Sequence, residues 1–391
     1  RREEATASVR DALQGRMDTR DPSRTSTGSP ERTASGTAER PGAGPSDRTP
    51  HEQASALVRA CHLGKSFDVS LPWMNRVLSG APRQAIRAVD DVSFEIARGE
   101  TLALVGESGC GKSTVARLLV GLQRVSTGRV LVDGHEVTAG VNPALHGRLQ
   151  MIFQDPYASL NPRWDVARIV SEPIHTHDPG CTDAQRTDRV AHLLEQVGLS
   201  PADAHRFPHQ FSGGQRQRIS IARALASAPE FIVCDEPTSA LDVSVQAQVL
   251  NLMRDLQRDA GLTYLFISHN LAVIHHVSDR IGVMYLGCLV ELATKEELFA
   301  RPLHPYTRML LDAIPDLQMS GRTRIPVAGE VPNPLSPPGG CTFHPRCPHA
   351  QARCRHERPT RRTLANGREV ACHAVEEDRL PEHGSAVAHS R

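Results

Sequence analysis

One stretch decides the fold of this chain: residues 101–121 read TLALVGESGCGKSTVARLLVG. An apolar run from Leu102 to Val105 stops at Gly106, and apolar residues return at helical spacing from Val115 onward, which predicts a strand, a glycine-rich loop and a helix. The spacing Gly-x4-Gly-Lys-Ser suits a phosphate-binding loop, because glycines let backbone N–H groups turn inward and the helix points its positive end at the anion. The predicted phosphate-binding residues are Gly106, Glu107, Ser108, Gly109, Cys110, Gly111, Lys112, Ser113 and Thr114.

Two residues of this loop have distinct chemical tasks in the prediction. Lys112 reaches the β- and γ-phosphates, and the hydroxyl of Ser113 ligates Mg²⁺. The loop therefore predicts a nucleoside triphosphate as the ligand.

Composition narrows the classes of protein that this chain can belong to. Its 391 residues suggest two to three domains, and 39% hydrophobic residues suffice for an ordinary core. A net charge of +1 gives no indication of nucleic acid or of an anionic membrane as a partner. The longest apolar stretch, Ile281 to Val290, is about half the length of a membrane span, and the charged N-terminus lacks the apolar region of a signal peptide. We therefore expect a cytoplasmic protein without a disulfide framework, despite nine cysteines.

The chain before the phosphate loop divides into a polar segment and a small predicted sheet. Residues 1–54 carry few large apolar residues, which predicts disorder. The patterns of residues 56–62 and 85–96 suit antiparallel strands, with an inserted loop at 71–83. Between the strands, Phe67 is placed either to stack on a nucleotide base or to pack in the core.

Three further segments end in polar residues of the kind that act on phosphates. A short strand ends at Gln154, the buried strand 231–235 ends in Asp235 and Glu236, and the apolar strand 263–267 delivers His269. Because ligands bind at the carboxyl ends of strands in an open parallel sheet, these side chains should meet the phosphate loop. Asp235 suits a magnesium site, and Glu236 lies where an attacking water can be polarised.

A second anion-binding helix start is predicted about a hundred residues after the phosphate loop. The amphipathic helix 183–197, with Thr182 or Asp183 as its N-cap, precedes it. The sequence SGGQ then opens another helix, with a serine and two glycines at its positive end. The residues concerned are Ser212, Gly213, Gly214 and Gln215.

Taken together, these motifs resemble those of the ATP-binding cassette (ABC) proteins. In chain order, the Walker A loop is GESGCGKST at 106–114, the Q-loop residue is Gln154, the signature is FSGGQ at 211–215, the Walker B strand is FIVCDEP at 231–237, the D-loop is SALD at 239–242 with Asp242, and the switch histidine is His269. The departures, Phe211 in the signature and Asn270 after the histidine, remove no catalytic group. The resemblance implies an α/β fold, namely a P-loop NTPase core of the ABC type with a small antiparallel β subdomain and a helical signature subdomain, plus a C-terminal Cys-rich extension.

The implied domains are a cassette at 55–315, with its helical subdomain at about 155–225, an extension at 316–375 and a flexible tail at 376–391. ATP and Mg²⁺ are the implied cofactors. Glu236, His269 and Gln154 are the implied catalytic residues, and Ser113, Gln154 and Asp235 the implied magnesium ligands.

Three further stretches are similar to the second, F-type, ATPase subunit of dipeptide and oligopeptide importers. They are QDPYASLNPR at 154–163, HPYTRMLL at 304–311 and GCTFHPRCPHA at 340–350. The resemblance implies a peripheral subunit on the cytoplasmic face of the membrane that docks on two permease subunits and is supplied by an extracellular solute-binding protein. Because the chain has one cassette, it must pair head to tail with a second copy or a paralogue.

Four cysteines, Cys341, Cys347, Cys354 and Cys372, lie in a Pro-rich segment with few large apolar residues. Their spacing misses the paired Cys-x2-Cys of common zinc modules, but clustered thiolates suggest a metal that holds the segment together. Similar tails in the importer family hold a [4Fe–4S] cluster, which is the preferred interpretation; zinc and reduced thiols are the alternatives. Nearby histidines that could replace a cysteine ligand are His344, His349, His356 and His373.

Other functions share the cassette and are weighed against the importer. An ATPase of nucleic-acid maintenance usually carries long coiled-coil insertions or a second cassette, and neither is visible. A regulator that binds nucleotide without hydrolysis is disfavoured by Glu236. An exporter ATPase is disfavoured by the C-terminal segment, and an importer for nickel or another small solute stays open.

Overall fold

Strand β3 (Thr101–Val105), which precedes the phosphate loop, is buried along its whole length and lies between β8 and β9 in a large sheet. The computed structural model describes residues 56–70, 72, 75, 76, 78, 82–137, 143–313 and 329–381. The expected disordered segment 1–54, most of the inserted loop 71–83 and the end of the tail from 382 lie outside the described residues. Residues from Ala56 onward belong to one compact unit.

The large sheet has eight strands in the order β11-β12-β10-β9-β3-β8-β7-β6. The strands from β6 to β9 in this order are parallel, and β10, β12 and β11 add to the sheet in antiparallel pairs. The bounds are β6 Leu149–Ile152, β7 Phe231–Asp235, β8 Thr263–Ile267, β9 Arg280–Tyr285, β10 Cys288–Thr294, β11 Arg362–Thr363 and β12 Glu369–Val370. The carboxyl ends of β3, β6, β7 and β8 therefore meet at one edge, as predicted.

A second sheet of four antiparallel strands has the order β2-β1-β4-β5. Its strands are β1 Ala56–Asp68, β2 Ala85–Ala97, β4 Thr127–Val132 and β5 His135–Glu136. Asp133 and Gly134, both with positive φ, make the tight turn between β4 and β5. The predicted antiparallel pair is confirmed, but β1 is longer than predicted, so Phe67 lies inside it rather than in a connection.

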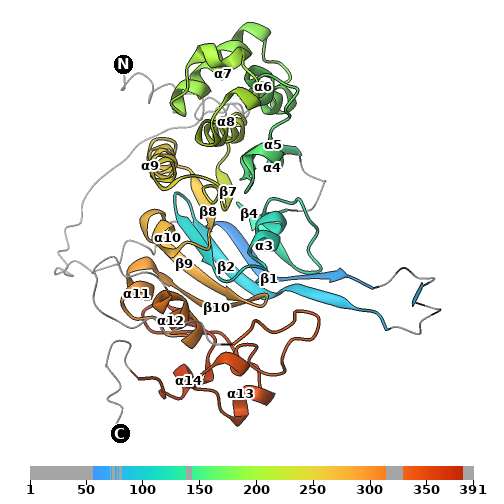
Figure 1. The fold of residues 1–391 in the computed structure, drawn as a ribbon, viewed down its shortest axis with the longest axis vertical. Coiled ribbons are helices and arrows are strands. Elements are labelled where there is room, and N and C mark those ends of the chain that lie inside the picture. Colours follow the sequence, from blue (N-terminus) through green and yellow to red (C-terminus); the bar gives the residue numbers. More distant parts are fainter. Residues whose placement is uncertain are drawn as a thin grey trace, which may run out of the picture. The chain divides into compact units, whose positions relative to one another are not determined.

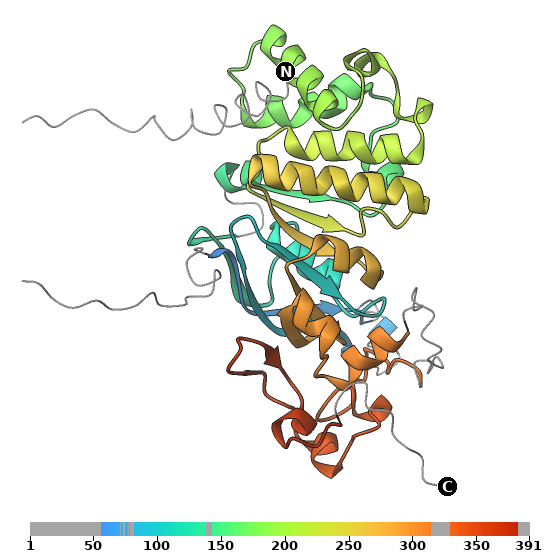
Figure 2. The same cartoon turned by 90° about the vertical axis from the view of Figure 1, so that its left-hand side faces the viewer.

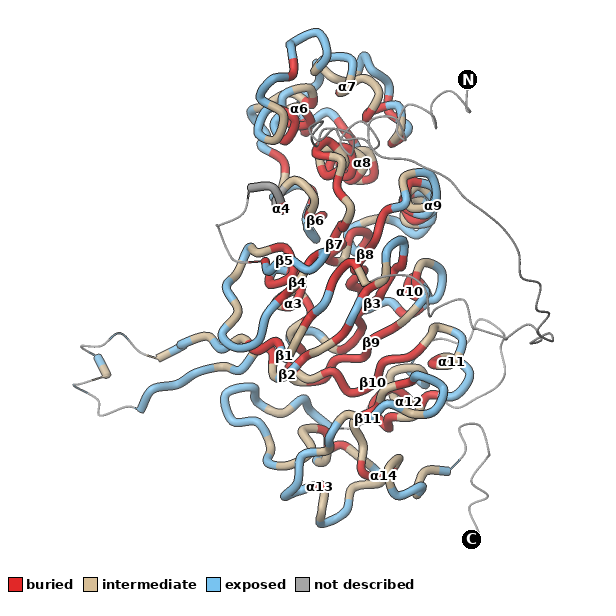
Figure 3. The backbone as a smooth tube through the Cα atoms, turned by 180° about the vertical axis from the view of Figure 1, so that it is seen from behind, coloured by how far each residue is buried: buried red, intermediate tan, exposed pale blue. Residues whose placement is uncertain are grey.

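Alternation along the central strands buries both faces of the large sheet. Leu102 and Leu104 of β3 belong to a core shared with the antiparallel sheet and with α3 (Lys112–Leu119). Ala103 and Val105 belong to the other core, shared with the helices on the opposite face. Figure 3 shows the buried residues concentrated along these strands. A strand that is covered on both faces needs a continuous apolar run, and such a run at residues 102–105 is what allowed β3 to be predicted from the sequence.

The helices after β6 form a separate layer. Figures 1 and 2 show α6, α7 and α8 grouped at one end of the described unit, with the sheets below them. Their bounds, with the short helices before them, are α4 Pro143–Arg148, α5 Pro156–Ser159, α6 Val166–His177, α7 Asp183–Gln196 and α8 Gly213–Leu225, with 3-10 turns at Pro201–His205 and Pro208–Gln210. The predicted N-cap of α7 is confirmed: Thr182 and Gln185 form a reciprocal capping box.

The remaining helices follow the strands of the large sheet and continue into the C-terminal part. They are α9 Val243–Ala260, α10 Leu271–Val277, α11 Lys295–Ala300, α12 Pro305–Asp312, a 3-10 turn at His344–Arg346, α13 Ala352–His356 and α14 His373–Glu376. We use "C-terminal segment" for residues 329–381, which Figure 1 shows at the opposite end of the unit from α6–α8.

The C-terminal segment is held by more than the sequence analysis expected. Phe343 is 1% exposed, and its ring packs against those of Tyr285, Tyr306 and His304 at centroid distances of 5.2, 5.4 and 5.6 Å. The argument that this Pro-rich segment must rely on a metal was therefore wrong in one respect. One aromatic residue, together with the two-residue strand β12 on β10, already attaches the segment to the cassette.

Candidate active site

The loop after β3 is shaped by two close approaches of the backbone. A Cβ atom on Gly106 would lie 2.2 Å from the carbonyl oxygen of Met284, and one on Gly111 would lie 2.3 Å from that of Ala88. Both glycines have positive φ, at 149° and 106°. No other residue fits these positions, which explains the glycine spacing.

Lys112 begins helix α3 and is 5% exposed. Its Nζ donates to the carbonyl oxygens of Gly106 and Glu107 at 2.8 and 3.0 Å, so the ammonium lies inside the curve of the loop. Around it, Cys110 is buried, Gly111 and Thr114 are half-buried, and Ser108 and Gly109 are exposed. Burial raises the pKa of the Cys110 thiol, which keeps it neutral beside the lysine.

Ser113 and Asp235 meet although 122 residues separate them in sequence. Ser113 Oγ donates to Asp235 Oδ1 at 2.9 Å. Burial raises the pKa of Asp235, an effect that the Ser113 hydroxyl partly offsets. A hydroxyl and a carboxylate oxygen are ligand types that Mg²⁺ prefers, and a divalent cation would supply the positive charge that this buried carboxylate lacks. The residues therefore fit Mg²⁺.

Glu236 connects two strand ends at the same edge. Its Oε2 accepts from Gln154 Nε2 at 2.8 Å, and its Oε1 lies 3.0 Å from His269 Nδ1. Its backbone has φ 48°, a rare value for a side chain of this size, and its N–H donates to the carbonyl oxygen of Ile267 at 3.0 Å. The neighbouring strand thus holds Glu236 in a strained conformation that turns its carboxylate toward Gln154 and His269.

The predicted signature residues lie elsewhere. Ser212 caps α8: its Oγ accepts from the Gln215 N–H at 3.3 Å, and Gln215 Oε1 accepts from the Ser212 N–H at 3.0 Å. Of the two glycines between them, Gly213 is half-buried and Gly214 is buried. Figure 1 places α8 in the helical layer, away from α3. Within one chain, the structure does not bring the two predicted anion-binding helix starts together.

The two remaining predicted nucleotide-site residues are Asp242 and Phe67. Asp242 is exposed at the N-cap position of α9 without a side-chain capping bond. Phe67 is half-buried, with Lys65 Nζ 5.0 Å from its ring centroid, so it is not a core residue. Of its two interpretations, core packing is wrong.

Two contacts to the loop were missed by the sequence analysis. Tyr306 Oη accepts from the Glu107 N–H at 2.9 Å, and Arg346 donates to both carboxylate oxygens of Glu107 at 2.7 and 2.9 Å. These partners follow Glu107 by 199 and 239 residues, and no periodicity or motif spacing marks such a pair. A carboxylate in a phosphate-binding loop was the one available signal, because such a group needs a cationic partner.

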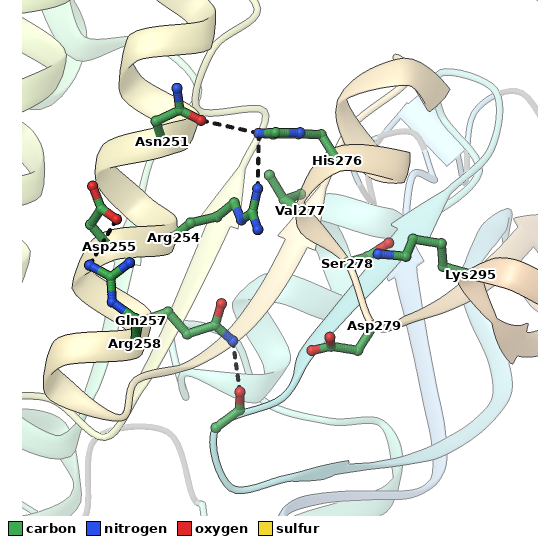
Figure 4. A pocket seen from close by; sticks show the side chains of 11 residues that line it. Asn251, Arg254, Asp255, Gln257, Arg258, His276, Val277, Ser278, Asp279 and Lys295 are labelled. Atoms are coloured by element: carbon green, nitrogen blue, oxygen red, sulfur yellow. Dashed lines mark hydrogen bonds and ion pairs between the residues drawn. The ribbon is translucent and has the colours of Figure 1, made fainter.

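A polar pocket of about 610 Å³ lies at the other edge of the sheet. It is bordered by Gly99 and Asp279, which precede β3 and β9, and by α9 (Figure 4). There Arg254 lies 3.4 Å from His276, which in turn lies 3.2 Å from Asn251. Because it lies at the amino ends of the strands, this pocket is separate from the predicted phosphate site.

The predicted metal site in the C-terminal segment is not supported by the structure. In the described part of the chain, no group of three or more Cys, His, Asp or Glu side chains is arranged to hold a metal ion. The thiols nevertheless influence one another electrostatically: the pKa of Cys341 is raised to about 12, mainly by burial, and Cys372, Cys347 and Cys354 contribute to this rise. No disulfide joins them.

Two of the four histidines proposed as substitute ligands hydrogen-bond with backbone carbonyl oxygens. His344 Nδ1 lies 3.0 Å from the Cys341 carbonyl oxygen, and His373 Nε2 lies 3.1 Å from that of Glu357. Burial lowers the pKa of His349.

None of the described helices combines the length and apolarity of a bilayer span.

Comparisons with known proteins agree with this geometry. Residues 89–239 match the ABC transporter family, and residues 290–354 match the family of oligopeptide/dipeptide transporter C-terminal regions. The oligopeptide transport ATP-binding protein AppF of Bacillus subtilis is 50% identical over 74% of this chain and 89% of its own length. OppF of Escherichia coli is 49% identical, over 71% of this chain and 85% of its own.

Solved structures show the same fold. A dimeric ATP-binding cassette in a post-hydrolysis state, bound to ADP and phosphate, superposes with a TM-score of 0.53 at 26% identity. It covers 61% of this chain and 98% of the other. The fold, the strand-end residues and the extent of these matches lead to one conclusion: the chain belongs to the oligopeptide and dipeptide branch of the ABC transporter ATP-binding proteins.

Proposed function

We propose that this chain is the ATP-hydrolysing subunit of an importer for dipeptides or oligopeptides. The observation that carries the proposal is the convergence of Ser113 with Asp235, and of Gln154 with Glu236 and His269, at the edge where the phosphate loop ends. The printed names of AppF and OppF, which describe oligopeptide transport, support peptides as the transported class.

In this proposal the phosphate loop binds ATP through its backbone N–H groups and Lys112. Ser113, Asp235 and Gln154 would hold Mg²⁺. Gln154 would do so through its side-chain oxygen Oε1, because its Nε2 donates to Glu236. When bound, Mg²⁺ neutralises phosphate charge and orients the γ-phosphate. Phe67 is proposed to stack on the adenine base of ATP, because part of its ring is exposed.

Glu236 is the proposed general base, which takes the proton of the attacking water. Its carboxylate is oriented from both sides, by the Gln154 amide and by the His269 imidazole. The side chain of Glu236 is 17% exposed and that of His269 is 62% exposed, so the base is shielded while the histidine faces outward. This arrangement suits a residue that is held in place until a second surface closes over it.

That second surface is proposed to be the signature of another cassette. Ser212, Gly213, Gly214 and Gln215 present a positive helix end that α3 of the same chain does not reach. A second copy or a paralogue, arranged head to tail, would place this end and Asp242 against the nucleotide. Two membrane permeases and an extracellular solute-binding protein complete the proposed importer, with this subunit on the cytoplasmic face of the membrane.

The test is uptake of a labelled tripeptide in the host. Deletion of the gene should abolish uptake, the parent gene should restore it, and a Lys112→Ala gene should not. Unchanged peptide uptake together with lost nickel uptake would replace the peptide by nickel. Unchanged uptake of both, with a defect in DNA repair or translation, would favour a non-transport ATPase.

A [4Fe–4S] cluster on Cys341, Cys347, Cys354 and Cys372 is a separate proposal. It is supported by the burial of Cys341, Cys347 and Cys372, which raises the pKa of each of these thiols, because thiolates need a cationic partner when buried. Protein purified without oxygen should be brown, contain about four irons per chain as a four-iron cluster requires, and lose them in Cys347→Ser. Stoichiometric zinc would replace iron as the metal, and colourless, metal-free protein would contradict any metal site.

A further inference from the structure

Glu107 is fixed at three points, and two of them come from distant parts of the chain. Its carbonyl oxygen accepts from Lys112, its N–H donates to Tyr306, and its carboxylate accepts both hydrogen bonds from Arg346. A two-pronged Arg–carboxylate contact fixes orientation as well as charge. The C-terminal segment therefore determines where the first side chain of the phosphate loop points.

Arg346 is buried where it makes this contact. Its side chain is 2% exposed and its backbone ends the 3-10 turn His344–Arg346. The guanidinium faces the ring of Tyr285, whose hydroxyl is 3.5 Å from Nη1. Phe343, three residues earlier, anchors this turn in the core. The guanidinium is thus built into the protein next to the loop and is not a surface ion pair that solvent could replace.

Charge explains why such a contact is needed. The loop must accept a triphosphate with several negative charges, and an unpaired carboxylate at Glu107 would repel it. We propose that Arg346 is a positioning residue for nucleotide binding: it neutralises Glu107 and turns its carboxylate away from the phosphates. This inference rests on the proposed function of the loop, but it concerns a residue outside the nucleotide-binding motifs that predicted the loop's function.

The chain supplies a matched control. Arg368 and Glu291 form a second buried Arg–Glu pair, with side chains 5% and 0% exposed and Nη2 at 2.9 Å from Oε1. This pair also joins the C-terminal segment to the cassette, but it contacts Leu303 and His304 rather than the phosphate loop. A change at Arg368 therefore reports what loss of a buried pair does to the fold alone.

The experiment measures binding of Mg²⁺ with a non-hydrolysable β,γ-imido analogue of ATP to the full chain. The variants are Arg346→Met, Glu107→Gln, the double variant Arg346→Met/Glu107→Gln, and Arg368→Met. If charge at the loop is decisive, Arg346→Met should bind about tenfold more weakly in 50 mM salt, and the loss should shrink to about threefold in 300 mM salt because salt screens the repulsion. Glu107→Gln should bind about threefold more tightly than the parent in 50 mM salt, because Arg346 is then unneutralised beside the phosphates.

The double variant decides whether Arg346 acts by neutralising Glu107 or only by stabilising the fold. It restores neutrality, so its affinity should return to within about twofold of the parent, the usual scatter of such comparisons. Arg368→Met should lower the melting temperature and leave the affinity unchanged. A double variant that binds as weakly as Arg346→Met, or a loss that salt does not reduce, would show a purely structural pair and overturn the proposal.

Two further controls keep the result decisive. If Arg346→Met does not fold, Arg346→Lys, which keeps the charge but not the two-pronged contact, should lose about threefold in affinity and respond little to salt. A tenfold loss that salt relieves in Arg346→Lys would overturn the proposal. Lys112→Ala should abolish binding. If the parent binds no better than Lys112→Ala, the proposed function of the loop fails, which is a different result from a normal parent with indifferent Arg346 variants.

Discussion

The carboxyl edge of the large sheet and the C-terminal segment are held together by different means. At the edge, Asp235 and Glu236 are neighbours in sequence, and each reactive side chain lies within two residues of the end of its strand. The C-terminal segment is instead attached mainly by individual side chains that no parallel strand positions: the buried ring of Phe343, Arg368 on Glu291 and Arg346 on Glu107.

The difference separates chemistry from support. Parallel strands place the edge residues automatically, so their substitution should change the reaction and leave the fold intact. The C-terminal contacts bury aromatic and charged groups together, so their substitution should change stability and, through Glu107, the loop. Each prediction below tests one side of this division.

The largest effect is expected at the edge, for Glu236→Gln. Hydrolysis should fall about 10²–10⁴-fold, the usual contribution of a positioned base, while nucleotide binding persists because the amide keeps the shape of the carboxylate. Steady-state phosphate release and nucleotide binding measure the two quantities. A dimer with trapped ATP should accumulate, which size-exclusion chromatography detects.

The control for this prediction is Thr187→Ala, on the exposed side of α7. Thr187 Oγ1 donates to the carbonyl oxygen of Asp183 at 2.9 Å, and Thr187 belongs to none of the nucleotide-binding motifs. Its turnover should stay within about threefold of the parent, as expected for an exposed hydrogen bond. Turnover of Glu236→Gln within threefold of the parent would remove Glu236 as the base.

The next effect is expected in the C-terminal segment, for Phe343→Ala. Removing this buried ring should lower the free energy of unfolding by about 3 kcal/mol, the lower end for phenylalanine in a core. Leu335→Ala is the matched control, because Leu335 lies in the same Pro-rich stretch but is 44% exposed, and it should change stability by less than about 0.5 kcal/mol. Denaturant unfolding measures both; equal effects would mean that Phe343 does not anchor the segment.

How much the sequence predicts follows the same division. The glycine loop, the strand ends at Gln154, Asp235 and His269, and the cap at Thr182 all depend on residues close in sequence, and the structure places them as expected. The length of β1 and the place of Phe343 depend on partners that no local pattern reveals. Composition alone made the Pro-rich segment look short of apolar groups, because a count of residues does not show where one ring packs.

The roles of Arg346 and Tyr306 were invisible for a stronger reason. Each contacts Glu107 through a single polar group, and the family-like stretches that contain them, 304–311 and 340–350, do not indicate Glu107 as their partner. Tyr306 is fully buried and could be expected to need a hydrogen-bond partner, but its partner is a backbone N–H, which leaves no trace in the sequence.

The smallest expected effect is the pH dependence of stability that His304 causes. His304 lies among the contacts of the C-terminal segment and not at the carboxyl edge of the large sheet. His304 caps α12: its Nδ1 accepts from the Tyr306 N–H at 3.0 Å, its own N–H donates to Glu291 at 2.8 Å, and its ring packs near Phe343. Burial lowers the pKa of His304 from 6.5 to about 3, so the folded protein holds it neutral.

Below pH 6.5 the unfolded chain binds a proton at His304, whereas the folded chain keeps this histidine neutral. The free energy of unfolding therefore falls as the pH drops from 6.5 toward 3. One unit below 6.5, at pH 5.5, the loss from this residue should be about 1.4 kcal/mol relative to neutral pH. Denaturant unfolding of the parent and of His304→Asn at pH 7.5 and 5.5 isolates it, because asparagine caps a helix without titrating. The variant should be less sensitive to acid by this amount even if its stability at pH 7.5 is lower. Equal sensitivity in both proteins would mean that His304 takes up its proton in the folded state, and that the contacts of the C-terminal segment with the cassette tolerate a charge at this position.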